Sequence, residues 1–192
     1  MKKNLFLTLL VLITIGGLFL RLIDYDRTPP FGETMDEFMY PFAGISLLQT
    51  GVPTSWTGFV LYPEAGEREI WGINLRFASP WNEKPPLYPL LTGAVSLLAG
   101  ENSFAKIRLT TIRLIPIALN VVSIVLVGLL AAHFWGPGVG ILSAVIYATA
   151  PIFVLASRLS VTENLLVPLS LLALWLYSRG ISSTEKYIPV AV

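Results

Sequence analysis

Three short clusters of ionisable residues in this chain could do chemistry on a charged substrate. The first is Asp36-Glu37, a pair of adjacent carboxylates. A carboxylate beside an acceptor hydroxyl or amine can take its proton, as a general base does. Apolar residues follow the pair at roughly helical spacing, which predicts an amphipathic helix at a membrane surface that begins with the two acids. Helix capping is an ordinary alternative, since the helix dipole favours acidic side chains at an N-terminus.

The second cluster is Glu83-Lys84-Pro85-Pro86. The two prolines favour an extended backbone followed by the first turn of a helix, so the charged residues lie directly before that helix. Lys84 could bind a phosphate there as a point charge. It could equally be an interfacial anchor whose ammonium group reaches the lipid headgroups.

The third cluster is the segment 157–164, which contains Arg158 and Glu163 between two apolar stretches. Arginine has the planar fork of donors that grips a phosphate bidentately. The same charged residues would also suit a tight turn that ends two helices.

The composition indicates that these clusters belong to a membrane protein. Hydrophobic residues make up 54% of the 192 residues and charged residues 13%, whereas soluble domains carry about 25% charge. The mean hydropathy is +0.70, which indicates an integral membrane protein. A net charge of +1 argues against nucleic acid as a partner. The absence of cysteine and the single histidine exclude disulfides, thiolate metal sites and clusters of imidazoles.

Residues 1–23 form the first expected span, and Lys2 and Lys3 predict a cytoplasmic N-terminus. A signal peptide is the alternative, but charged residues follow where a small-x-small cleavage site would lie. Further spans are expected at 114–135, 138–156 and 164–178. Residues 187–192 resemble the cut-off start of another span, because a half-span cannot satisfy its backbone in lipid. We therefore expect a missing C-terminal region, or a partner chain, to continue it.

Residues 24–113 are expected to form a long outer loop that carries interfacial helices. Its apolar stretch 87–99 is shorter than the roughly 17–25 residues that a spanning helix needs. If this stretch crosses the membrane, Arg108 becomes cytoplasmic. If it only dips into the outer leaflet, Arg108 and Arg158 lie on the same side as Asp36. The second topology is favoured, because it gathers cations near one acid.

The order of these motifs resembles the GT-C glycosyltransferases. It is most similar to the family of protein O-mannosyltransferases and of the aminoarabinose transferases that modify lipid A. The resemblance rests on an acidic pair followed by a tyrosine, a glycine, a Glu-Lys-Pro-Pro-Leu motif, a second glycine and an arginine, here Asp36, Glu37, Tyr40, Gly51, Glu83–Leu87, Gly100 and Arg108. It implies an all-α integral membrane protein, a multispanning helical bundle of which residues 1–192 are the N-terminal part.

The resemblance also implies an activity. Such an enzyme moves a sugar from a polyprenyl-phosphate-linked donor to a protein, lipid or glycan at the outer face of the cell membrane. Asp36 matches the acid that acts on the acceptor, with Glu37 beside it. Lys84 matches the lysine that meets the carrier phosphate, and Arg108 and Arg158 would add positive charge there.

A divalent metal ion is a further implication of the resemblance. The spacing of Arg158 and Glu163 resembles an outer-loop motif of oligosaccharyltransferase catalytic subunits, whose acids help to bind a metal. Here a glutamate replaces the commoner aspartate. Glu83, in the Lys-Pro-Pro-Leu region, is the other candidate ligand.

Two other classes remain open for the sequence. A transporter fragment would carry intramembrane charges that face a cavity, whereas the charges here gather at span ends and in one loop. A non-catalytic membrane subunit is the second alternative. For the enzyme, we expect the 192-residue chain alone to be inactive, because the later spans of the family lie beyond it.

Overall fold

The computed structural model describes residues 1–31, 34, 36–62 and 65–184. Residues 187–192, where the sequence predicts the start of another span, lie outside the described residues. The chain forms two compact units. The helical unit comprises residues 1–23, 117–157 and 163–192, and the loop unit comprises residues 24–116 and 158–162. All but one of the predicted site residues belong to the loop unit.

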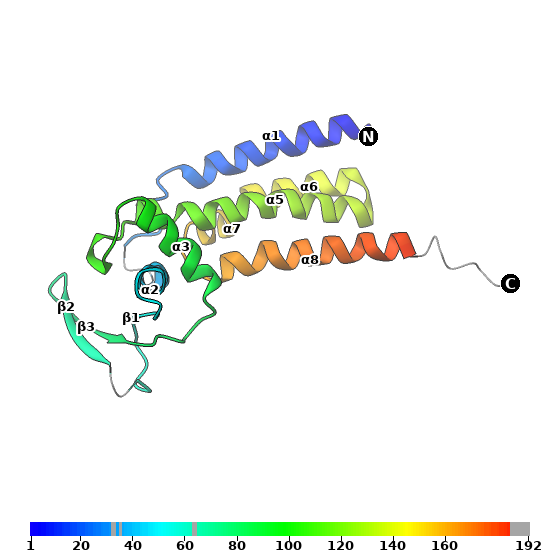
Figure 1. Ribbon diagram of the computed structural model, residues 1–192. Helices are drawn as coiled ribbons and strands as arrows, with labels where there is room; N and C mark the ends of the chain where they lie inside the picture. The colour runs from blue at the N-terminus through cyan, green and yellow to red at the C-terminus, as the bar shows by residue number, and fades with distance from the viewer. Residues whose placement is uncertain (32–33, 35, 63–64, 185–192) are drawn as a thin grey trace. The chain divides into compact units, whose positions relative to one another are not determined.

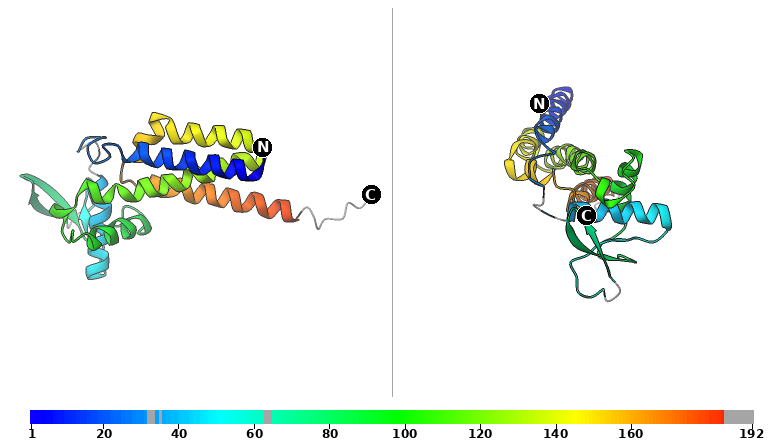
Figure 2. Two further views of the ribbon diagram at one scale, coloured as in Figure 1. Left: turned by 90° about the horizontal axis from the view of Figure 1, so that it is seen from above. Right: turned by 90° about the vertical axis from the view of Figure 1, so that its left-hand side faces the viewer.

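Five helices build the described part of the helical unit, and the longer ones run alongside one another in Figures 1 and 2. They are α1 (Lys3–Leu22), α5 (Leu114–Trp135), α6 (Pro137–Thr149), α7 (Pro151–Ala156) and α8 (Glu163–Thr184). Within the described part of the chain, Lys3–Leu22 and Leu109–Trp135 are long and apolar enough to cross a membrane. The helices α1, α5 and α8 overlap the segments 1–23, 114–135 and 164–178, where the sequence predicts spans.

Small residues let α1, α5 and α6 approach closely. A Cβ atom added at Gly17 would lie 2.6 Å from Ile124 Cδ1, and one added at Gly128 would lie 2.7 Å from Leu10 Cδ1. Close backbone approach at glycine and alanine is the usual way in which helices associate in lipid, where burial of apolar surface gives no drive.

The expected span 138–156 is divided into two helices. Pro151 has no amide hydrogen to continue α6, and a proline pushes the residue before it out of the helical region. Ala150 accordingly has an extended backbone, with φ −63° and ψ 127°. Buried Arg21 donates to the carbonyl oxygens of Tyr147 and Ala148 near this break, at 3.1 and 3.0 Å. The break therefore does not leave these carbonyl groups without a donor.

The loop unit contains both helices and strands, so the expectation of an all-α chain is wrong here. Its elements are α2 (Asp36–Thr50), β1 (Ser55–Trp56), β2 (Gly66–Ile70), β3 (Ile73–Ala78), α3 (Leu87–Leu98), the 3-10 helix η1 (Phe104–Lys106) and α4 (Leu109–Ile112). The strands form an antiparallel sheet in the order β1-β3-β2.

The sequence of β3 explains why a sheet forms. Leu75 and Phe77 are buried and alternate with Asn74 and Arg76, which is the period of a strand with one covered face. Ile70 pairs with Ile73 across a two-residue turn. The two turn residues, Trp71 and Gly72, have φ values of 55° and 75°, and positive φ at both positions matches the twist of the strands.

Helix α2 is the centre of the loop unit, and the expected amphipathic surface helix is a buried one. Its residues from Glu37 to Ser46 are buried with the exception of Phe42. It crosses α3 at two glycines. A Cβ atom on Gly44 would lie 1.8 Å from the carbonyl oxygen of Pro89, and one on Gly93 would lie 2.5 Å from Gly44 C. Helix α2 packs against α3 and β1, so most of its surface lies inside the loop unit.

We predict that Gly44→Ala destabilises the loop unit, because the added methyl group meets backbone that cannot rotate away. Overpacking of this kind costs about 1–3 kcal/mol or more. The matched control is Gly66→Ala, where nothing lies within 4 Å of the added atom. Thermal unfolding of both variants in detergent, followed by circular dichroism, measures the difference. Equal midpoints for the two variants would show that the α2–α3 contact is not tight.

Candidate active site

A buried ion pair fixes the start of α2. The carboxylate of Glu37 accepts from Arg113 Nε at 2.9 Å and from Arg113 Nη2 at 2.7 Å, and the two side chains are 1% and 0% exposed. Arg113 Nη1 donates to the carbonyl oxygens of Tyr25 and Pro29, each at 2.8 Å. A bidentate pair with further hydrogen bonds is the arrangement in which buried charges are tolerated.

The segment 158–162 attaches to the same ion pair. The amide of Ser160 donates to Glu37 Oε1 at 2.9 Å, and its hydroxyl lies 3.0 Å from the buried Tyr88 hydroxyl. Arg158 Nη1 donates to the carbonyl oxygen of Thr28 at 3.2 Å. These bonds bring Arg158 into the loop unit, although it follows α5, α6 and α7 in the chain.

Burial lowers the pKa of the Arg158 guanidinium. The nearby carboxylate of Asp24 raises this pKa, and the positive charge of Arg113 lowers it further. Arginine nevertheless stays protonated in proteins. Arg158 therefore provides a partly desolvated positive charge next to the segment that holds Glu37.

Asp36, the first residue of α2, differs from its neighbour in exposure. It is half-buried, whereas Glu37 is fully buried. Its amide donates to the hydroxyl of Thr34 at 3.2 Å, and its carboxylate has no hydrogen-bond or ion-pair partner among the described residues. Of the two adjacent acids, Asp36 is thus the one that a substrate can reach.

Lys84 lies at the rim of a largely apolar pocket in the loop unit. The pocket has a volume of about 250 Å³ and is lined by Ala43, Leu47, Pro53, Trp81, Asn82, Lys84, Pro86 and Pro89. Lys84 is exposed and Trp81 is buried. As the sequence predicts, the Pro-Pro pair directly precedes a helix, α3, whose N-cap is Pro86. This places an ammonium group beside an apolar surface.

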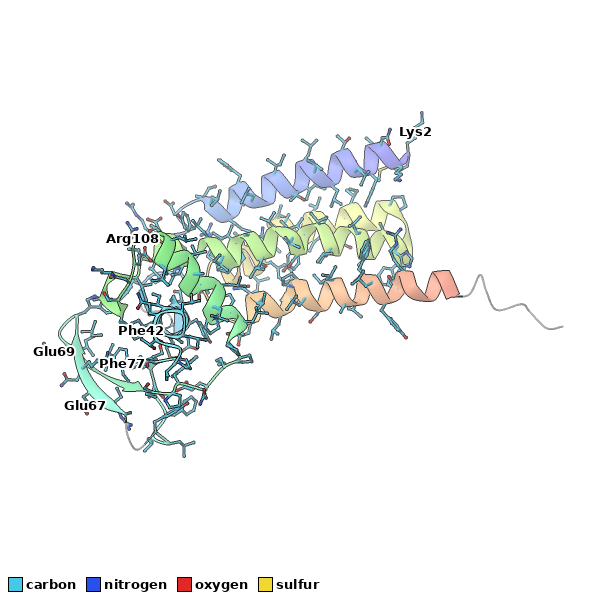
Figure 3. All side chains as sticks on the ribbon, viewed as in Figure 1. Lys2, Phe42, Glu67, Glu69, Phe77 and Arg108 are labelled. Atoms are coloured by element: carbon cyan, nitrogen blue, oxygen red, sulfur yellow. The ribbon has the colours of Figure 1, made fainter. Side chains whose placement is uncertain are left out.

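Arg108 is exposed, as Lys84 is, and it directly precedes α4. Its Nε donates to Glu101 Oε1 at 2.7 Å, and its side chain is 62% exposed while that of Glu101 is 3% exposed. Figure 3 labels Arg108. Among the described residues, no ion pair or hydrogen bond joins Asp36, Lys84 and Arg108 to one another. The loop unit therefore holds all three without linking them directly.

The two candidate metal ligands belong to different units. Glu83 accepts a short hydrogen bond from the Thr57 hydroxyl in the loop unit, and Glu163 is the first residue of α8 in the helical unit. The described residues contain no group of three or more side chains of the kinds that hold a metal ion. The expectation that Glu83 and Glu163 bind a divalent metal stays a prediction.

Sequence reasoning missed the residues that organise this site. Arg113, Ser160 and Tyr88 were not among the candidates, because their partners are far away in the chain: Glu37 lies 76 positions before Arg113 and 123 positions before Ser160. A charged residue directly before a long apolar stretch was the one available signal for Arg113. It indicates a buried or interfacial cation without naming its partner.

Two helices of the described chain that are long and apolar enough to cross a bilayer indicate a membrane protein, and its loop unit holds a half-buried carboxylate and several cations. A sequence model of the family described as dolichyl-phosphate-mannose-protein mannosyltransferase matches residues 83–192. The match covers more than half of the chain, and the chain belongs to this family of membrane-bound GT-C glycosyltransferases. The resemblance found in the sequence is thereby confirmed.

The matched region includes Lys84, Arg108 and Arg158 and begins after Asp36 and Glu37. No curated protein matches the chain, and no solved structure matches it either.

We predict that Arg113→Gln destabilises the protein much more than Arg108→Gln, although both remove one guanidinium from an ion pair. Loss of Arg113 leaves the buried Glu37 carboxylate without its partner, which lowers the free energy of unfolding by about 3–5 kcal/mol. Loss of the exposed Arg108 costs less than about 1 kcal/mol. Denaturant unfolding of both variants in the same detergent measures the difference. Similar losses would show that the Glu37–Arg113 pair is no more important than a surface contact.

Proposed function

We propose that these residues serve a glycosyltransferase that moves a sugar from a polyprenyl-phosphate donor to an acceptor on a protein, lipid or glycan. We propose further that the loop unit lies at the outer face of the cell membrane and that the reaction takes place there. The observation that carries the proposal is the position of Lys84, at the rim of an apolar pocket in a chain of this family. An ammonium group beside an apolar surface suits a ligand that is part phosphate and part isoprenoid chain.

Asp36 is the proposed general base. Its carboxylate takes the proton from the acceptor hydroxyl or amine, and the freed electron pair attacks the anomeric carbon of the sugar. The bond between that carbon and the phosphate oxygen breaks, and its electrons leave with polyprenyl phosphate. No further co-reactant is needed, because a phosphate is a good leaving group.

Glu37 has a different proposed role. Both of its oxygen atoms accept from Arg113, and one also accepts from the Ser160 amide. A carboxylate held in this way is poorly suited to accept a substrate proton. We assign Glu37 as a positioning residue that holds the first turn of α2, and with it Asp36, in place.

Lys84, Arg108 and Arg158 are the proposed phosphate ligands. Fixed cations stabilise the negative charge that grows on the leaving phosphate, and they do so more strongly where water is excluded. Lys84 is best placed for the first contact with the donor, since it is exposed beside the apolar pocket. Arg158 offers a less hydrated charge, and Arg108 an exposed one that also pairs with Glu101.

We predict that Asp36→Asn in the full-length protein keeps donor binding and lowers turnover about 100-fold or more, because the amide cannot accept the proton. Single-turnover transfer and equilibrium donor binding, measured separately on detergent-purified protein, distinguish the two effects. Asp36→Glu is the matched control, since it keeps the carboxylate and shifts it by one methylene. Full activity of Asp36→Asn would remove Asp36 as the base.

We predict that Lys84→Ala weakens donor binding by about 10-fold or more, since a charge-assisted contact to phosphate is lost. Lys84→Arg should restore part of the affinity, because it keeps the charge but differs in shape. The matched control is Lys106→Ala, which removes an exposed lysine outside this pocket. Unchanged donor affinity in Lys84→Ala would return this lysine to the role of a membrane anchor.

We also predict that positions 36, 108 and 158 all face the outside of the cell. Cysteine introduced singly at each position of this cysteine-free chain should react with a membrane-impermeant maleimide in intact cells. A cysteine at Lys2 is the control and should react only after lysis. Labelling of position 108 only after lysis would contradict the proposal, and would make residues 87–99 a true span.

A further inference from the structure

A second pocket in the loop unit has no part in the proposed transfer. Its volume is about 420 Å³, and it lies between α2, the β2–β3 hairpin and the segment 102–105. Cavities of roughly 300–1,000 Å³ are typical of small-molecule sites. None of Asp36, Lys84, Arg108 and Arg158 lines it. A ligand of the proposed transfer site would therefore not explain this pocket.

Three aromatic rings form one wall of this pocket. Phe42, Phe77 and Phe104 line it, and their ring centroids are 5.3 to 5.7 Å apart in edge-to-face pairs. Phe77 and Phe104 are almost fully buried and Phe42 is half-buried, so the core fixes the wall and Phe42 presents ring surface to a ligand. A fixed aromatic surface suits the apolar face of a ring-shaped ligand.

The charge at the pocket is positive. Arg68 of β2 lines it, and the guanidinium carbon of Arg68 lies 5.0 Å from the centroid of Phe77. Its neighbours Glu67 and Glu69 point to the opposite face of the strand, because side chains alternate. Figure 3 shows these two glutamates along the outer edge of the hairpin, away from Phe42 and Phe77. Among the described residues, no carboxylate lines the pocket.

A second cation lies next to the pocket, and amide groups complete it. Lys106 Nζ donates to Asn102 Oδ1 at 3.1 Å, and Asn102 lines the pocket together with Gln49 and Ser103. Gln49 and Arg68 are both exposed, and their side chains have no hydrogen-bond partner among the described residues. Their donors are available to a ligand. An aromatic acid could stack on a ring and pair with Arg68, but it would form no hydrogen bonds with these amide and hydroxyl groups.

We propose that this pocket binds an acidic saccharide, in which one sugar ring stacks on Phe42 and its carboxylate meets Arg68. Gln49, Asn102 and Ser103 bind the sugar hydroxyls. The inference rests on the proposed function in one respect, since it assigns the bound saccharide as part of the acceptor. It deepens that function by naming the acceptor as an acidic glycan.

Calorimetric titration of the full chain in lipid nanodiscs, with digalacturonate as the probe and no donor present, tests the inference. We expect saturable binding of digalacturonate, and binding at least about 10-fold weaker for its dimethyl ester, which lacks the charge. Arg68→Gln should weaken digalacturonate binding by a similar factor and leave the weak ester binding unchanged. Arg27→Gln is the matched control, because it removes an exposed arginine outside the pocket.

A further variant fills the pocket. Gln49→Trp adds bulk at the exposed rim, and we expect it to abolish binding of both probes while the circular dichroism spectrum stays native. Equal binding of acid and ester, or a loss in Arg27→Gln as large as that in Arg68→Gln, would overturn the inference. Hexanoate, a carboxylate without a ring, should not compete, and competition by it would reduce the site to a simple anion site.

Failure of this inference differs from failure of the proposed function. The titration contains no donor, so it is independent of transfer. Loss of digalacturonate binding alongside normal transfer in the full-length protein would overturn only the acidic glycan as ligand. Binding without transfer to any acceptor would leave the pocket in place and overturn the glycosyltransferase mechanism.

Discussion

The buried pair of Glu37 and Arg113 is the interaction on which the loop unit depends. Two full charges without water are tolerated only where every donor and acceptor is used. Here Arg113 also donates to two backbone carbonyl groups, and Glu37 also accepts from a backbone amide. The pair thereby joins the segment after α1, the start of α2, the end of α4 and the segment 158–162. Such an interaction fixes geometry more than it adds stability.

This constraint explains how two adjacent acids can have different roles. On a helix, neighbouring side chains point about 100° apart, so a carboxylate locked into the interior leaves its neighbour directed elsewhere. Glu37 is held on the interior side, and Asp36 remains accessible at the first position of α2. The rigid partner supplies orientation, and the accessible acid keeps the freedom to meet a substrate. If both acids were exposed, no buried contact would fix the orientation of the first turn of α2.

Much of the molecule could be predicted from the sequence, and the failures have clear physical reasons. Apolar runs predicted the long helices α1 and α5, since length and hydropathy are local properties. The family followed from short motifs around Asp36 and Lys84. The sheet was not predicted, although Ile73–Ala78 alternates in polarity, because one short alternating segment does not show which other segments pair with it. The Glu37–Arg113 pair could not be found, because one sequence does not show which distant charges meet.

The attachment of residues 158–162 to the loop unit has a consequence for biosynthesis. A chain is made from its N-terminus, and its parts fold as they emerge. Glu37 can meet Arg113 once residue 113 has been added to the chain, but the Ser160 amide is made 123 positions after Glu37. The helices α5, α6 and α7 must be synthesised in between. The loop unit, which carries the candidate site, therefore forms in two steps. Its last hydrogen bonds, those of residues 158–162, can form only after α5, α6 and α7 have been synthesised.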